Sequence, residues 1–210
     1  MSTTVQSPAV VALEGLCDGF SDVTYQSQEV FRQVLAAMAE PGTRHDLAQL
    51  AAPGPLSPAA YQVCLALLDQ ETPVWLAPDV TSAAVINSLR FHCGCGIAAR
   101  SDQALFALVT AQGGCSLSAF NQGGFEYPDR SATVIVEVDA LEEAGELVLE
   151  GPGIPQQRHV HIAGIDAGWL QQLAENRAGF PCGVDLILTC GSQVMALPRT
   201  TRVSFEGQEK

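Results

Sequence analysis

The stretch from Val184 to Cys190 restricts the fold of this chain more than any other. It reads VDLILTC, so only Asp185 and Thr189 interrupt an apolar run. A strand of this composition is buried on both faces, which predicts a place in the interior of a sheet. Gly191 and Ser192 then form a two-residue connection of the kind that closes a hairpin, because glycine accepts the positive φ of such turns. Residues 193–197 are therefore predicted to be the return strand.

The residues after this hairpin predict a small polar cluster. Pro198 ends the return strand, and two arginines and two threonines follow it: Arg199, Thr200, Thr201 and Arg202. Two guanidinium groups and two hydroxyls beside a buried strand suit a phosphate or a carboxylate. A buried carboxylate needs a partner, so we expect Asp185 to pair with Arg199 or Arg202.

Length and composition indicate one folded domain. With 210 residues, 47% of them apolar and 16% charged, the chain is predicted to form a loosely ordered lead-in, residues 1–20, and a single α/β domain, residues 21–210. Its first residues lack a secretory signal, and its apolar runs are too short to cross a membrane, so we expect a cytoplasmic protein with no membrane partner. The net charge of -13 argues against a nucleic-acid partner, because phosphate backbones bind to basic surfaces.

Lysine and cysteine usage limits the chemistry. The single lysine, Lys210, is the last residue, so no internal lysine can form a Schiff base with pyridoxal phosphate or complete a phosphate-binding nucleotide loop. No cofactor is therefore expected. The seven cysteines are expected to be free thiols packed as small apolar side chains in a reducing compartment.

The periodicity of apolar residues predicts helices and strands that alternate in the first half and hairpin-like strands in the second. The expected helices run from Ser27 until Pro41 stops the first, over 57–69, 82–91 and 102–110, and from a cap at Asp166. The expected further strands are 44–50, 72–76, 97–99, 131–138, 146–149 and 159–162. This order favours an α/β layered fold with a mixed sheet.

Two groups of soft ligands stand out, although neither predicts a metal site. His92 lies beside Cys93 and Cys95, and His159 and His161 share one face of an expected strand. Zinc sites need more ligands at recognisable spacings, and these groups lack them. We therefore expect buried thiols and solvated histidines, with no metal bound.

Four stretches resemble the H subunit family of the carbon-phosphorus lyase system, the bacterial machinery that degrades phosphonates. They are FRQVLAAMAEPGT, DQETPVWL, SLRFH and FPCGVDLILTCGSQVMALPRTTRV, and they span residues 31–203. The resemblance implies a three-layer α/β fold similar to pyridoxal phosphate-dependent transferases, but without the cofactor lysine.

The resemblance also implies a role within a multi-subunit transferase. Such a subunit acts with the G, I and L subunits to displace adenine from MgATP with an alkylphosphonate, which gives a ribose 1-phosphonate 5-triphosphate. It joins a core assembly that includes the J subunit, and it forms a homodimer when isolated. It is a required partner in these reactions, so the resemblance assigns no catalytic residue.

The candidate residues for a phosphate-bearing ligand or a subunit interface combine the C-terminal cluster with the SLRFH block. They are Arg199, Arg202, Thr200, Thr201, Asp185, Arg90 and His92. Two alternatives stay open at this point. One is a free-standing metal-dependent hydrolase built on His92, Cys93, His159 and His161, and the other is a purely structural dimer.

Overall fold

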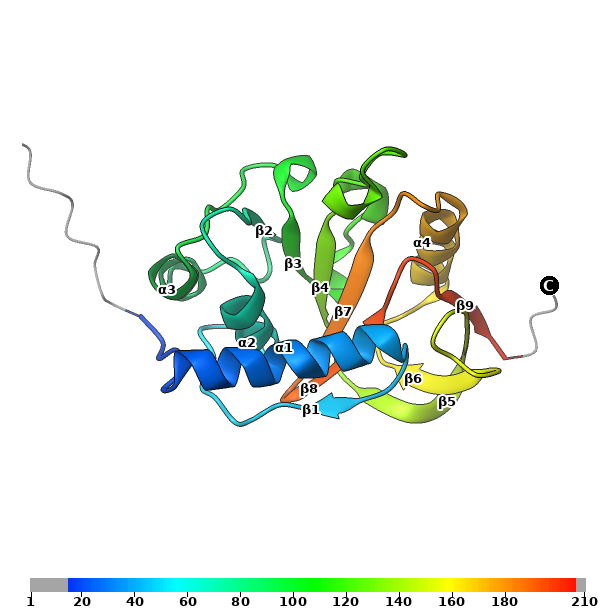
Figure 1. Cartoon of the computed structure of the whole chain (residues 1–210), viewed down its shortest axis with the longest axis horizontal. Helices are drawn as coiled ribbons and strands as arrows, with labels where there is room; N and C mark the ends of the chain where they lie inside the picture. The colour runs from blue at the N-terminus through cyan, green and yellow to red at the C-terminus, as the bar shows by residue number, and fades with distance from the viewer. Residues whose placement is uncertain (1–14, 207–210) are drawn as a thin grey trace, which may run out of the picture.

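The computed structural model describes residues 15–206, which form a mixed α/β fold around a six-stranded sheet (Figure 1). The strand order is β1-β8-β7-β4-β3-β2. The strands are β1 (His45–Asp46), β2 (Val74–Leu76), β3 (Phe106–Thr110), β4 (Thr133–Glu137), β7 (Asp185–Cys190) and β8 (Gln193–Leu197). Strands β2, β3, β4 and β7 are parallel, whereas β8 and β1 are antiparallel to their neighbours, which confirms the mixed sheet.

A second, three-stranded sheet has the order β6-β5-β9. Its strands are β5 (Leu141–Glu150), β6 (Arg158–Ile162) and β9 (Arg202–Phe205). Both pairs in it are antiparallel. In Figure 1 this small sheet lies beside the large one, on the same side as α4 (Ala167–Ala178).

Three further helices complete the fold. They are α1 (Val23–Ala39), α2 (Pro58–Leu67) and α3 (Ala83–Cys93), and short 3-10 segments cover Ser101–Gln103, Ala111–Gly113, Leu117–Ala119 and Pro128–Arg130. Figure 1 shows α1 and α2 in front of the large sheet, with α3 at one end of the molecule and α4 at the other. Within residues 15–206 no helix is long and apolar enough to cross a membrane.

Strand β7 has the interior position that its apolar run predicted. It lies between β4 and β8, and Leu186, Ile187 and Leu188 are each at most 1% exposed. The hairpin is confirmed as well, because β7 pairs antiparallel with β8 and Gly191 takes a φ of +55°. The sequence therefore specified the centre of the sheet correctly.

The helix predicted over 102–110 is wrong. Only Ser101–Gln103 is helical, as a 3-10 turn, and Phe106–Thr110 is β3, an interior parallel strand. Its inner residues Ala107, Leu108 and Val109 are fully buried. A strand buried on both faces has no polar alternation, so its apolar run resembles a short buried helix.

Several expected boundaries also change. Helix α1 was expected to start with a cap at Ser27, but it begins at Val23. The cap is Asp22, whose side chain accepts a hydrogen bond from the Tyr25 backbone N–H. The strand expected over 44–50 is only β1, and the one expected over 97–99 is a single bridge between Val74 and Ile97.

The first fourteen residues of the predicted lead-in lie outside the described part of the chain. The backbone at Cys17 is hydrogen-bonded to side chains of α3. The backbone N–H of Cys17 donates to Ser88 Oγ at 3.0 Å, and the ring Nε2 of His92 lies 2.9 Å from the Cys17 carbonyl oxygen. The division of the chain at residue 20 stays a prediction.

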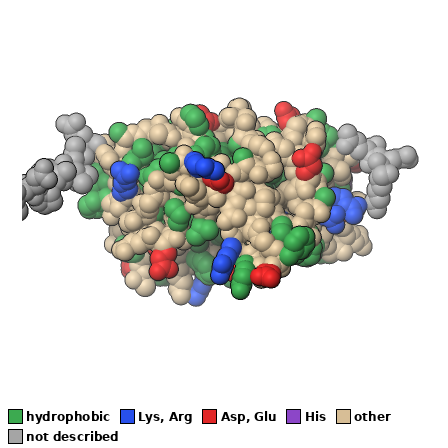
Figure 2. Space-filling view, turned by 90° about the horizontal axis from the view of Figure 1, so that it is seen from above, with side chains coloured by type: hydrophobic (Ala, Val, Ile, Leu, Met, Phe, Trp, Pro, Cys, Tyr) green, Lys and Arg blue, Asp and Glu red, His purple; other side chains and the backbone are tan. Residues whose placement is uncertain are grey.

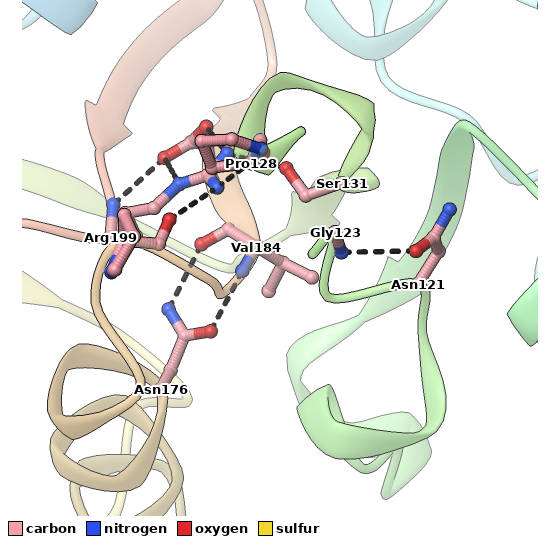
Figure 3. Close-up of polar contacts among 9 residues, drawn as sticks. Asn121, Gly123, Pro128, Ser131, Asn176, Val184 and Arg199 are labelled. Atoms are coloured by element: carbon pink, nitrogen blue, oxygen red, sulfur yellow. Dashed lines mark hydrogen bonds and ion pairs between the residues drawn. The ribbon is translucent and has the colours of Figure 1, made fainter. Parts of the chain in front are cut away.

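Asn176 in α4 fixes the entry into β7 (Figure 3). Its side chain donates from Nδ2 to the Val184 carbonyl at 2.9 Å and accepts at Oδ1 from the Val184 backbone N–H at 2.8 Å. Val184 precedes the first residue of β7, so this amide serves the backbone as a neighbouring strand would. Both residues are buried, and water cannot replace these bonds easily.

Replacing Asn176 with Ala should therefore destabilise the fold by about 2 to 4 kcal/mol, because two buried backbone groups lose their partners. Urea unfolding of the purified chain measures this. Gln171→Ala on the same helix is the matched control, because Gln171 makes an exposed hydrogen bond to Glu175. Equal midpoints for the two variants would contradict the role given to Asn176.

Candidate functional site

Arg199 is the best-connected polar side chain in the predicted cluster (Figure 3). Its Nε and Nη2 donate to the two carboxylate oxygens of Asp185 at 3.1 and 2.5 Å. Nη1 donates to the carbonyl oxygens of Pro128 at 2.9 Å and Pro181 at 3.2 Å, and Nη2 also donates to Ser131 Oγ at 2.5 Å. A guanidinium has five N–H donors, so every donor of Arg199 is used within the protein.

This clamp joins segments that are distant in sequence. Asp185 begins β7, Pro128 and Ser131 lie just before β4, and Pro181 lies in the connection that follows α4. Asp185 Oδ1 also accepts from the Arg199 backbone N–H at 2.8 Å. The expected pairing of Asp185 is confirmed with Arg199, whose side chain is only 12% exposed.

The rest of the C-terminal cluster is directed elsewhere. Arg202 begins β9 and donates to Glu150 of β5 at 2.9 Å, so the two arginines pair with carboxylates on different sheets. Thr201 is 4% exposed, and Thr200 accepts from Arg177 Nε through its backbone carbonyl at 3.3 Å. The structure therefore does not bring the two guanidinium groups to one point.

The other sequence candidates lie apart from this clamp. Arg90 and His92 are exposed in the last turn of α3, at the far end of the molecule from α4 and β9 (Figure 1). His159 and His161 are on β6, where His161 Nδ1 lies 3.1 Å from Glu146. Among the described residues no group of three or more His, Cys, Asp and Glu side chains could hold a metal ion.

The edge where the parallel strands begin, here called the amino edge, presents exposed aromatic side chains. Phe125 is 81% exposed, Phe180 60% and Tyr127 51%. Phe180 also lines an open hollow of about 340 Å³ together with Pro128 and other residues of the clamp. Figure 2 looks down on the top of Figure 1, where this edge lies, and shows a mainly uncharged surface with scattered arginine side chains and scattered Asp or Glu side chains.

The loops that carry these aromatics are held rigidly. Asn121 Oδ1 accepts from the Gly123 backbone N–H at 3.0 Å (Figure 3). Its Nδ2 donates to the Arg130 carbonyl at 2.9 Å. The Arg130 guanidinium lies 4.1 Å from the centre of the Tyr127 ring, within the range of a cation–π contact. Together with the Arg199 clamp, these contacts tie the loops of the amino edge to one another and to the sheet.

The opposite edge, where the parallel strands end, is acidic. Asp79 accepts a short hydrogen bond from Thr110, and Asp139 accepts from Gln112 at 2.6 Å. A hollow of about 530 Å³ opens beside Gln112 and extends to α4. Open α/β sheets commonly bind ligands at this carboxyl edge, but carboxylates there repel an anionic ligand.

Glu137 is the most buried carboxylate at the carboxyl edge. It accepts from the Ser57 backbone N–H at 2.6 Å, at the start of α2, and from Thr189 Oγ1 at 3.2 Å. Burial raises the pKa of Glu137 above its ordinary value, and the hydrogen bonds from Ser57 and Thr189 oppose that shift only in part. The carboxylate therefore connects α2, β4 and β7 while remaining able to take up a proton.

Several of these groups were not among the residues expected from the sequence. The acceptors at Pro128 and Pro181 are backbone carbonyls, which any residue carries, so no residue type could mark them. Glu137 had a usable signal, because it is a carboxylate at the end of the buried strand predicted over 131–138. Phe180 also had a signal, because it directly precedes a proline and lies outside the apolar run of β7. Both features indicate an exposed position.

Removal of the Arg199 side chain should destabilise the chain strongly. Arg199→Ala leaves the largely buried Asp185 carboxylate without its partner, and the expected loss is about 3 kcal/mol of unfolding free energy. Arg202→Ala is the matched control, because that pair is more exposed and its loss should stay below about 1 kcal/mol. Chemical denaturation at neutral pH distinguishes the two, and similar losses would refute the clamp.

The raised pKa of Glu137 predicts a pH-dependent stability difference. A carboxyl whose pKa is higher in the folded chain stabilises it most below its unfolded pKa, near 4.5, and loses that contribution as pH rises through the folded value. Glu137→Gln keeps both hydrogen bonds, because the Thr189 hydroxyl can turn and accept. The stability of this variant relative to the natural chain should therefore rise between pH 4 and neutral pH, and a pH-independent difference would contradict the assignment.

Comparison with known proteins places the chain in a family. Residues 18–204 match the family model described as bacterial phosphonate metabolism protein (PhnH). The chain is 39% identical over 191 residues to the alpha-D-ribose 1-methylphosphonate 5-triphosphate synthase subunit PhnH of Rhizobium meliloti (strain 1021), which covers 89% of this chain and 94% of that protein. It is also 35% identical over 183 residues to HtxG of Stutzerimonas stutzeri, which is named as a C-P lyase subunit protein. That match covers 87% of this chain and 88% of HtxG. The chain therefore belongs to the PhnH family of bacterial phosphonate metabolism proteins.

Proposed function

We propose that this chain is a subunit of the transferase that forms a ribose 1-phosphonate 5-triphosphate from MgATP and an alkylphosphonate, with release of adenine. The observation that carries the proposal is the 39% identity to a synthase subunit over 94% of that relative. In this proposal the chain acts with the G, I and L subunits and joins the J subunit in the core assembly. Its isolated form is a cytoplasmic homodimer.

The geometry supports a partner role better than an independent active site. All five donors of Arg199 bind acceptors within the chain, and Arg202 pairs with Glu150. The carboxyl edge carries the carboxylates of Asp79, Glu137 and Asp139. The arginine cluster therefore contributes through positioning, while partner subunits complete the site for the anionic substrates.

The amino edge is the surface that we assign to a partner subunit of the synthase. Exposed aromatic side chains on a rigid support lose little conformational entropy when they are buried, and they are typical anchors of protein interfaces. Phe125, Tyr127 and Phe180 have this exposure, and the contacts of Asn121 and Arg199 supply the support. The Arg199 clamp thereby links the C-terminal family signature to assembly.

The fold is proposed to resemble pyridoxal phosphate-dependent transferases without their cofactor. The sequence supports the second half of this statement, since the chain has no lysine before residue 210. No lysine before residue 210 is therefore present to form an internal Schiff base with a carbonyl group. In this proposal the protein needs no bound cofactor of its own.

Native mass spectrometry of the chain co-expressed with its G, I, L and J partners tests the proposal. We expect a stoichiometric assembly, and exchange of both Phe125 and Phe180 for Ser should weaken it. Each buried aromatic anchor contributes on the order of 2 kcal/mol, so the loss in affinity should be at least about 30-fold.

The matched control is Tyr25→Ser, because Tyr25 is 63% exposed but lies on α1. It should assemble as the natural chain does. If the natural chain forms no assembly, the proposed function is wrong. If it assembles and the double variant does so equally well, only the assignment of the amino edge fails.

A further inference from the structure

A small hollow lies between α1, the segment around the end of β1, and α2. Its volume is about 20 Å³, which is room for one water molecule or one ion. Part of its wall is apolar, formed by Val30 at 3% exposure, Leu47 at 7% and Ala48. The other side chains that line it all carry an amide or a carboxylate, and they are Gln26, Glu29, Gln33, Asp46 and Gln62.

Gln62 of α2 is the buried polar side chain of this hollow, and the residue is only 1% exposed. Its Nε2 donates to the carbonyl oxygens of Ala48 at 2.8 Å and Pro58 at 3.1 Å, so both amide hydrogens are used. Within residues 15–206 no donor reaches its Oε1. The atom that Gln62 can offer to the hollow is therefore this oxygen, and a buried acceptor of this kind needs a partner.

Two carboxylates line the same hollow without a partner among the described residues. Glu29 lies on α1 and Asp46 ends β1, and both residues are exposed. The four ion pairs of residues 15–206 include neither of them, and no hydrogen bond reaches either carboxylate. Like charges beside one hollow repel each other, and the net charge of -13 adds to this repulsion. A cation between the two carboxylates would remove it.

The oxygens of the two remaining amides are already in use. Gln26 Oε1 accepts from the Asp22 backbone N–H at 2.9 Å, and Gln33 Oε1 lies 3.0 Å from His45 Nδ1. The oxygens left for a ligand are therefore those of the two carboxylates and of Gln62. Carboxylate and amide oxygens are the ligands that magnesium and calcium prefer, whereas zinc favours the nitrogen and sulfur ligands that this hollow lacks.

The three oxygen ligands come from elements that the fold already holds together. Asp46 pairs with Gln193 of β8, and the next backbone N–H, that of Leu47, donates to the Ser192 carbonyl at 2.8 Å. The hydrogen bond of Gln62 to the Ala48 carbonyl joins α2 to the same segment. Because this support exists without an ion, binding costs little ordering of the chain.

We propose that Glu29, Asp46 and Gln62 bind one hard divalent cation, either magnesium or calcium. The two carboxylates balance its charge of +2, the buried carbonyl supplies a third oxygen, and water completes the coordination on the exposed side. The ion would join α1 to β1 and α2. The site has two acidic ligands and one amide, so it is distinct from clusters of three or more His, Cys, Asp and Glu side chains. It does not depend on the proposed function.

Equilibrium dialysis of the purified full chain, stripped with EDTA, against CaCl₂ or MgCl₂ tests the site. We expect one bound ion per chain, with a dissociation constant on the order of 10⁻⁴ to 10⁻³ M, and the tighter of the two salts identifies the preferred ion. Glu29→Gln combined with Asp46→Asn should weaken binding by about tenfold or more, because both charged ligands are lost. At constant ionic strength the ion should raise the thermal unfolding midpoint of the natural chain but not of this double variant.

Glu71→Gln combined with Glu142→Gln is the matched control, because it also removes two exposed carboxylates but away from the hollow. It should bind the ion as the natural chain does. Equal weakening by the two double variants would indicate diffuse attraction of cations to an acidic chain and would overturn the proposal. Absence of a bound ion at ten times the expected dissociation constant would also overturn it, as would undiminished binding to the Glu29→Gln, Asp46→Asn variant.

Discussion

The ion pair between Arg199 and Asp185 determines where the central strand begins. Asp185 is the first residue of β7, and Arg199 follows the strand that pairs with β7, so the bond closes the open end of the hairpin. The remaining donors of Arg199 then hold the carbonyls of Pro128 and Pro181. A single guanidinium thereby sets the relative position of three chain segments that the sheet alone does not connect.

The centre of the sheet was readable from sequence because its signals are local. The apolar run of β7, the turn at Gly191 and the stop at Pro198 each specify their own conformation. Strand β3 was mistaken for a helix because a strand buried on both faces loses the alternation that identifies strands at the surface. The position of β9 was also unexpected, since its partner β5 begins about sixty residues earlier and no local pattern predicts that pairing.

The candidate site was predictable only in part, for a related reason. The charge complementarity of Asp185 and Arg199 was evident, because an acid in a buried strand needs a cation nearby. The sequence could not reveal how many N–H donors of Arg199 would bind acceptors within the protein. Two of the acceptors are carbonyls without a residue signature, and they convert an apparent anion-binding arginine into a structural clamp.

The two edges of the large sheet have different physical characters, and this difference bears on how a subunit of this family works. The carboxyl edge is acidic and contains Glu137, a carboxylate whose raised pKa shows incomplete compensation for its burial. The amino edge carries the exposed aromatic side chains, and the Arg199–Asp185 pair beside them is satisfied within the chain. Carboxylates at the carboxyl edge disfavour an anion there, whereas the aromatic side chains of the amino edge offer contact area to an apolar surface. The arginine-rich signature shapes the molecule from within, because its two guanidinium groups are already paired with carboxylates of this chain.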